Sequence, residues 1–187
     1  SFKDDKVHNW IFLGLFAGLG VLSKYLFIYL LIGINLFFIY HIKKNKKFNF
    51  KYFIPIIVFL LVLTPHLIWL VENDYKTITY GLKRTGFESS TPLNHFFYPI
   101  KFIFKQISIL LPFFLLLGLI LKNFKFKIDQ RDKKSIFLIF ATLAPILLMF
   151  TTSIIFAANI RTMWMTPFYL FFGVLLLYIF QKNILIK

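Results

Sequence analysis

Cysteine is absent from the 187-residue chain, so the chain has no disulfide, thiol nucleophile or cysteine-based metal site. Acidic residues are scarce, with 7 Asp and Glu against 22 Lys and Arg. The sequence also has no phosphate-binding P-loop, no dinucleotide-binding glycine motif and no catalytic serine or cysteine motif. These absences argue against soluble nucleotide chemistry and against nucleophilic catalysis by a serine or a cysteine.

Apolar residues are abundant instead, at 59% of the chain with 27 Phe. Soluble domains are usually about 45–50% apolar, so the composition indicates a membrane protein. The formal charge of +15 lies mainly in short segments between apolar runs. This arrangement is typical of membrane topology signals, and we expect no binding to nucleic acid.

The apolar runs predict an all-α polytopic bundle over residues 1–187 with about six transmembrane spans. A lysine interrupts the first run at Lys24, which favours two short helices that meet there. Gly14 and Gly18 form a GxxxG pair, which predicts close packing against a neighbouring helix. Pro65 is expected to kink or break the end of its span. The predicted spans cover residues 10–23, 25–40, 52–71, 96–121, 135–157 and 165–181.

Positive charge is distributed unevenly between the two sides of this predicted topology. One side receives 15 of the Lys and Arg residues, and the other side receives seven. The positive-inside rule makes the first side, with both chain ends, cytoplasmic. The polar segment 72–95, Lys24 and Arg161 then meet on the external face. Within that segment, apolar spacing predicts a short interfacial helix over 75–84.

Three basic residues on the external side are candidates for binding an anionic phosphate. Lys24 is either a lysine that snorkels to the membrane boundary or an anion clamp at that boundary. Lys83 and Arg84 end the interfacial helix, where they contact lipid headgroups or bind a phosphate. Arg84 can form a bidentate pair that a lysine cannot.

Other candidates for an external cavity have competing structural roles. His66 is either a hydrogen-bonding residue or a group that protonates a leaving phosphate. Trp69 and Trp164 are either interface anchors or surfaces on which a sugar ring stacks. Glu72 and Asp74 are candidate general bases, but loop solvation or helix capping by Asn73 and Asp74 is favoured. Arg161 can pair with these acids or with a phosphate. No metal site or cofactor is expected.

Four stretches resemble one enzyme family in the same order. They are LGLFAGLGVLSKY, PHLIWLVENDYKTITYGLKRTG, HFFYPIKFIFKQISILLPFF and RTMWMTPFYLFFG. The chain thereby resembles the bacterial family 39 glycosyltransferases of the dolichyl-phosphate-mannose protein mannosyltransferase superfamily, which includes the lipid A aminoarabinose transferase. The resemblance implies a GT-C transmembrane bundle in the bacterial inner membrane that transfers a sugar, with inversion, from a polyprenyl-phosphate donor.

The resemblance also implies roles for individual residues. Lys24 matches the family lysine near the donor phosphate, and Arg84, with Lys83, matches the cationic contact from the loop. The family's catalytic carboxylate lies in its first external loop, and no such acidic motif occurs here. We therefore expect the chain to be a fragment that begins after several spans and is inactive alone, with the general base upstream. The expected partners are membrane lipid, a lipid-linked sugar donor and a lipid, glycan or protein acceptor.

Two other function classes fit the same residues. A transporter or flippase of lipid-linked or anionic solutes would also use broken helices and buried cations. An internal inverted repeat would favour that class, and the two halves of the chain show no convincing one. A structural subunit of a membrane complex would leave Lys24 and Arg84 facing lipid headgroups, where neutral replacements would be tolerated.

Overall fold

A computed structural model describes residues 6–46, 49–86, 91–121 and 132–180. These residues form helices joined by turns, and no β-strand occurs among them. The helices are α1 (Val7–Ser23), α2 (Phe27–Asn45), η1 (Phe50–Tyr52), α3 (Phe53–Glu72), α4 (Lys76–Arg84), α5 (Asn94–Ile120), α6 (Lys133–Phe156), η3 (Thr162–Trp164) and α7 (Thr166–Phe180). The predicted all-α class is confirmed.

Four of these helices are long and apolar enough to cross a membrane, namely α2, α3 with the preceding η1, α5 and α6. The apolar helices α1 and α7 are shorter, with 17 and 15 residues. Many large apolar side chains on the outside of the bundle are exposed, including Phe16, Leu61 and Leu119. Exposed apolar surface of this extent fits contact with lipid acyl chains. The chain is an integral membrane bundle, and the predicted number of six spans stays a prediction.

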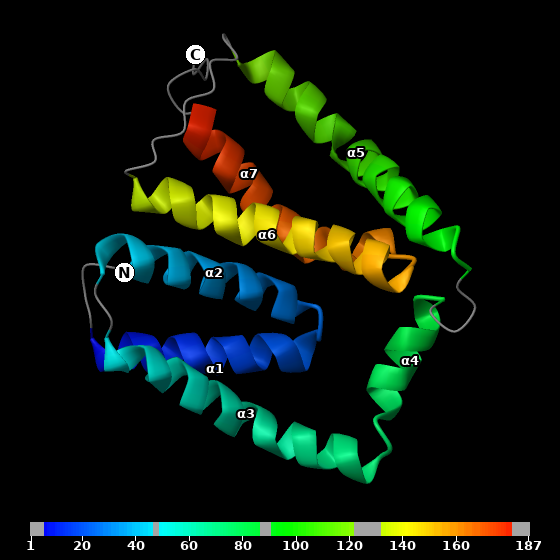
Figure 1. The fold of residues 1–187 in the computed structure, drawn as a ribbon. Helices are drawn as coiled ribbons and strands as arrows, with labels where there is room; N and C mark the ends of the chain where they lie inside the picture. Colours follow the sequence, from blue (N-terminus) through cyan, green and yellow to red (C-terminus); the bar gives the residue numbers. More distant parts are fainter. Residues whose placement is uncertain (1–5, 47–48, 87–90, 122–131, 181–187) are drawn as a thin grey trace.

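Packing proceeds in pairs: α1 lies on α3, α2 lies on α6, and α6 also contacts α5 and α7 (Figure 1). The α1–α3 contact uses the predicted GxxxG pair. A Cβ atom on Gly14 would lie 2.5 Å from the Pro55 carbonyl oxygen, and one on Gly18 would lie 2.7 Å from Val62. Only a residue without a side chain allows this approach, so the prediction of close packing is confirmed.

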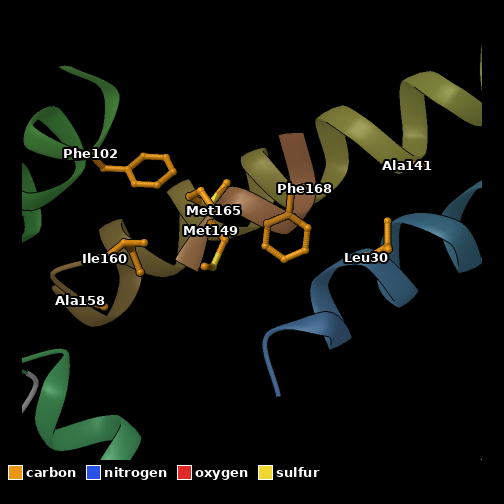
Figure 2. Packing of buried hydrophobic residues seen from close by; sticks show 8 residues of the cluster. All are labelled: Leu30, Phe102, Ala141, Met149, Ala158, Ile160, Met165 and Phe168. Carbon is orange, nitrogen blue, oxygen red and sulfur yellow. The ribbon is translucent and has the colours of Figure 1, made fainter. Parts of the chain in front are cut away.

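A buried apolar cluster lies where α6 and α7 meet the segment between them. Met149, Met165 and Phe168 are almost completely buried, and Phe102 reaches the cluster from α5 (Figure 2). Leu30 of α2 belongs to the same cluster. This core holds the 157–165 segment in place. The segment contains Met163, whose carbonyl oxygen lies beside the Lys24 side chain.

Three of the connections between helices lie at one end of the bundle. The turn between α1 and α2, the connection through α4 and the connection between α6 and α7 all lie at this end (Figure 1). We call it the α4 end. His95 at the start of α5 adds a link, because its Nδ1 donates to the Ile154 carbonyl oxygen at 2.6 Å. The convergence predicted from the sequence is therefore observed.

Candidate functional site at the α4 end

Lys24 occupies the break between α1 and α2. Its backbone is extended (φ −157°, ψ 116°), and its N–H donates to the Gly20 carbonyl oxygen, which closes α1. The side chain is partly exposed, and its Nζ lies 3.5 Å from the Met163 carbonyl oxygen in η3. Among the described residues, no carboxylate pairs with this ammonium group. An ammonium group has three donor hydrogens, so donors remain for a ligand.

The residue after Lys24 joins the α1–α2 turn to two helices. The Tyr25 hydroxyl lies 2.6 Å from His66 Nε2 in α3 and 2.7 Å from Thr77 Oγ1 in α4. Tyr25 has one hydroxyl proton, so it donates to one of these partners and accepts from the other. His66 also stacks on Trp69, with ring centroids 5.8 Å apart and planes 13° apart. His66 thus has a structural hydrogen-bonding role, and Trp69 is exposed beside it.

Helix α4 is held at both ends and open at its middle. At its start Thr77 bonds to Tyr25, and beyond its end the Asn159 N–H donates to the Thr85 carbonyl oxygen at 2.9 Å. A Cβ atom on Gly81, between these two links, would meet nothing within 4 Å. The predicted short helix over 75–84 is confirmed as Lys76–Arg84. It lies across the α4 end, with unfilled space at Gly81.

Lys83 and Arg84 lie in the last turn of α4 and are exposed. The Arg84 guanidinium donates to the Tyr80 hydroxyl at 3.3 Å and lies 5.5 Å from the centre of that ring. Arg84 therefore rests along its own helix, and no described contact joins it to Lys24.

The acidic candidates and Arg161 do not combine in the described structure. Glu72 is the last residue of α3, Asp74 lies in the turn before α4, and Arg161 precedes η3. All three are exposed, and no ion pair joins Arg161 to either acid within the ranges described. Trp164, another predicted cavity residue, packs against the buried cluster that contains Met165.

Of the two roles favoured for the polar residues before α4, helix capping is wrong, whereas Glu72 and Asp74 are exposed as loop solvation requires. Neither Asn73 nor Asp74 caps the helix: the residue before it is Tyr75, which has φ 53° and makes no capping bond. The Asn73 side chain instead donates to the Trp69 carbonyl oxygen at 2.9 Å, which satisfies the end of α3. Helix α3 continues through Pro65 to Glu72, so a break at Pro65 is wrong, and the alternative of a kink stays a prediction. The turn is built from left-handed residues, since Asp74 also has a positive φ of 51°.

Sequence reasoning missed Tyr25, Thr77 and Asn159, which fix α4 to the bundle. A tyrosine next to a lysine at a helix break was the only available signal. Hydrogen bonds between residues 41 and 52 positions apart leave no local pattern. The part of the chain that is described contains no group of three His, Asp, Glu or Cys side chains that could hold a metal ion.

The first part of the chain matches a known protein family. Residues 1–69 match the family model of dolichyl-phosphate-mannose-protein mannosyltransferases. The match covers α1, α2 and α3 as far as Trp69, and so contains Lys24, Tyr25 and His66. It links this segment to a family of membrane glycosyltransferases that use a lipid-linked sugar donor. No curated protein and no solved structure matches the chain.

Proposed function

We propose that the chain takes part in a membrane glycosyltransferase reaction at the α4 end of the bundle. A sugar moves from a polyprenyl-phosphate donor to a lipid, glycan or protein acceptor on the external, periplasmic face. In such a transfer the bond between the sugar C1 and the phosphate oxygen breaks, a bond between C1 and an acceptor hydroxyl oxygen forms, and the hydroxyl proton passes to a general base. The leaving phosphate then carries additional negative charge, and a fixed cation beside it lowers the barrier.

One observation carries the proposal: Lys24 lies in the family-matched segment with an ammonium group that has no acidic partner among the described residues. Its position at a helix break, against the Met163 carbonyl oxygen, suits a phosphate at the membrane boundary. Arg84 and Lys83 supply further positive charge from α4, and Arg161 supplies it from the segment before η3. We propose no general base within the chain.

The test uses the full-length protein in native membranes and a radiolabelled polyprenyl-phosphate sugar. Lys24→Ala and Arg84→Ala are compared with wild type at matched expression. Lys76→Ala serves as a control, because Lys76 is an exposed lysine of α4, the helix that also contains Arg84. We expect transfer by wild type and by the control, and a loss of about 100-fold in Lys24→Ala. Full transfer by both variants would refute the phosphate site. Flux of a lipid-linked substrate without transfer would favour the transporter.

A further inference from the structure

A second cationic feature lies on α5, away from the Tyr25 and His66 contacts. An open groove of about 580 Å³ runs between the outer face of α5 and η3. Its polar lining consists of Lys101, Lys105, Ser108 and Thr162, and Phe97 and Phe104 provide apolar walls. The groove thus combines two ammonium groups with hydrocarbon surface, a pairing that suits an amphipathic ligand.

Neither lysine is neutralised by the described protein. Helix α5 contains no acidic residue, and no carboxylate among the described residues pairs with either lysine. Lys101 Nζ lies 5.8 Å from the centre of the Phe97 ring. The two lysines are one helical turn apart on the same face, so their charges repel each other unless an anion lies between them.

The length of α5 places these lysines at different depths. The helix has 27 residues and is therefore about 40 Å long, against about 30 Å for the hydrocarbon core. If Ile120 lies at the far boundary, about 20 residues fill the core and Lys101 lies at the near boundary. Lys105 is then about 6 Å deeper. Its flexible stem can bring the ammonium group back toward the headgroup level, where lipid phosphates lie.

We propose that this groove binds the headgroup phosphate of an anionic phospholipid. The ammonium groups of Lys101 and Lys105 hold the phosphate, and the Thr162 hydroxyl, which has no hydrogen-bond partner among the described residues, donates to it. Phe104 lies one turn deeper than Lys101 and contacts the upper part of the acyl chains, whereas Phe97 lies one turn outward, at the headgroup level. The bound lipid would join α5 to η3, the same short helix whose Met163 carbonyl oxygen is near Lys24. The proposal does not depend on glycosyl transfer.

Native mass spectrometry of the full-length protein in detergent tests this site. Phosphatidylglycerol and phosphatidylcholine with identical acyl chains are titrated onto wild type, Lys101→Gln/Lys105→Gln and Lys101→Arg/Lys105→Arg. The control, Lys133→Gln/Lys134→Gln, removes the same charge from two exposed lysines at the start of α6. We expect the glutamine pair on α5 to weaken phosphatidylglycerol binding about thirtyfold, since each surface lysine contributes roughly 1 kcal/mol, or about fivefold. The arginine pair and the control should retain binding.

A second measurement does not depend on the variants folding. Phosphatidylglycerol with a photoreactive headgroup is cross-linked to the wild-type protein, and the labelled peptide is expected to contain residues 97–108. Equal phosphatidylglycerol binding by wild type and the α5 glutamine pair would overturn the proposal. An equal loss in the control would show general charge attraction and would also overturn it. Complete displacement by millimolar inorganic phosphate would indicate a free-anion site in place of a lipid site.

Discussion

Tyr25 at the α1–α2 turn and His66 in α3 are joined by a hydrogen bond of 2.6 Å between the tyrosine hydroxyl and Nε2. The same hydroxyl bonds to Thr77, so one side chain connects the α1–α2 turn and α3 to α4. Lys24 directly precedes this tyrosine. The position of the proposed phosphate-binding lysine and the position of α4 are therefore set by neighbouring residues.

Replacing Tyr25 with phenylalanine should release the start of α4. The substitution removes the hydroxyl and leaves His66 and Thr77 without this shared partner, at a cost of about 1–2 kcal/mol. Local opening of α4 should then become about 5–30 times more frequent. Limited trypsin digestion at Lys76, Lys83 and Arg84 in membranes measures this opening.

A matched control for that experiment is Tyr98→Phe, because the Tyr98 hydroxyl on α5 has no recorded hydrogen bond. This variant should be cleaved at the wild-type rate. Equal cleavage of α4 in wild type and Tyr25→Phe would show that the link at Asn159 alone holds the helix.

Alanine at Gly14 should destabilise the contact between α1 and α3. The new Cβ would lie 2.5 Å from the Pro55 carbonyl oxygen and 2.8 Å from the Val58 Cβ, so the helices must separate. Such overpacking typically costs about 1–3 kcal/mol. Thermal unfolding in detergent, followed by circular dichroism, should show a lower midpoint.

Gly81→Ala provides the opposite case within the same chain. Its Cβ would meet nothing within 4 Å, and alanine favours a helix interior over glycine by up to about 1 kcal/mol. The variant should therefore unfold at or above the wild-type temperature.

Equal midpoints for Gly14→Ala and wild type would mean that α1 and α3 are less tightly packed than described.

Local sequence patterns predicted the elements of the α4 end but not the bonds between them. The charge at Lys24 marked a helix break, and the spacing of apolar residues from Tyr75 marked α4. Both features depend on residues within one or two turns of each other. The links from Tyr25 and Asn159 to α4 depend on how distant helices pack, and periodicity carries no such information.

The errors have similarly local causes. Asn73 is a common capping residue type, but its side chain bonds backward to α3 and leaves α4 uncapped. A break at Pro65 is absent, since α3 continues for seven residues beyond the proline. For Asn73, the Trp69 carbonyl oxygen of α3 competes with the N–H groups of α4 as a hydrogen-bond partner. Sequence pattern alone cannot rank these two partners.

Gln106 and Tyr169 form a polar pair between α5 and α7. The Tyr169 hydroxyl donates to Gln106 Oε1, whereas Gln106 Nε2 is buried without a partner among the described residues. Tyr169→Phe should cost about 1–2 kcal/mol, because it leaves the buried amide without any side-chain partner. Thermal unfolding measures this loss.

Adding Gln106→Leu to Tyr169→Phe should recover most of that stability, because the double variant removes both polar groups of this pair and leaves neither one unpaired. Leucine is similar in size and suits contact with the neighbouring apolar side chains. A double variant that is less stable than Tyr169→Phe would show that Gln106 has another partner.

Asp132 caps α6 at the opposite end of the bundle. Its carboxylate accepts from the N–H groups of Lys134 and Ser135, at 3.1 and 3.3 Å, and from the Tyr178 hydroxyl of α7 at 2.5 Å. Asp132→Ala should therefore destabilise the protein by about 0.5–2 kcal/mol. Tyr178→Phe should have a smaller effect, since the two backbone bonds remain.

The same contacts give the cap a defined pH dependence. The hydrogen bond from Tyr178 has the largest effect on the pKa of Asp132 and lowers it, while desolvation raises it. The hydrogen bonds from the Lys134 and Ser135 backbone lower it further, so the pKa lies below its ordinary value. A carboxyl with a lowered folded-state pKa contributes stability above its unfolded-state pKa and loses it as the pH falls through the folded-state value. Wild type should therefore lose more stability than Asp132→Ala between neutral and acidic pH. Parallel unfolding curves for the two proteins across that range would show that the carboxylate contacts do not stabilise the fold.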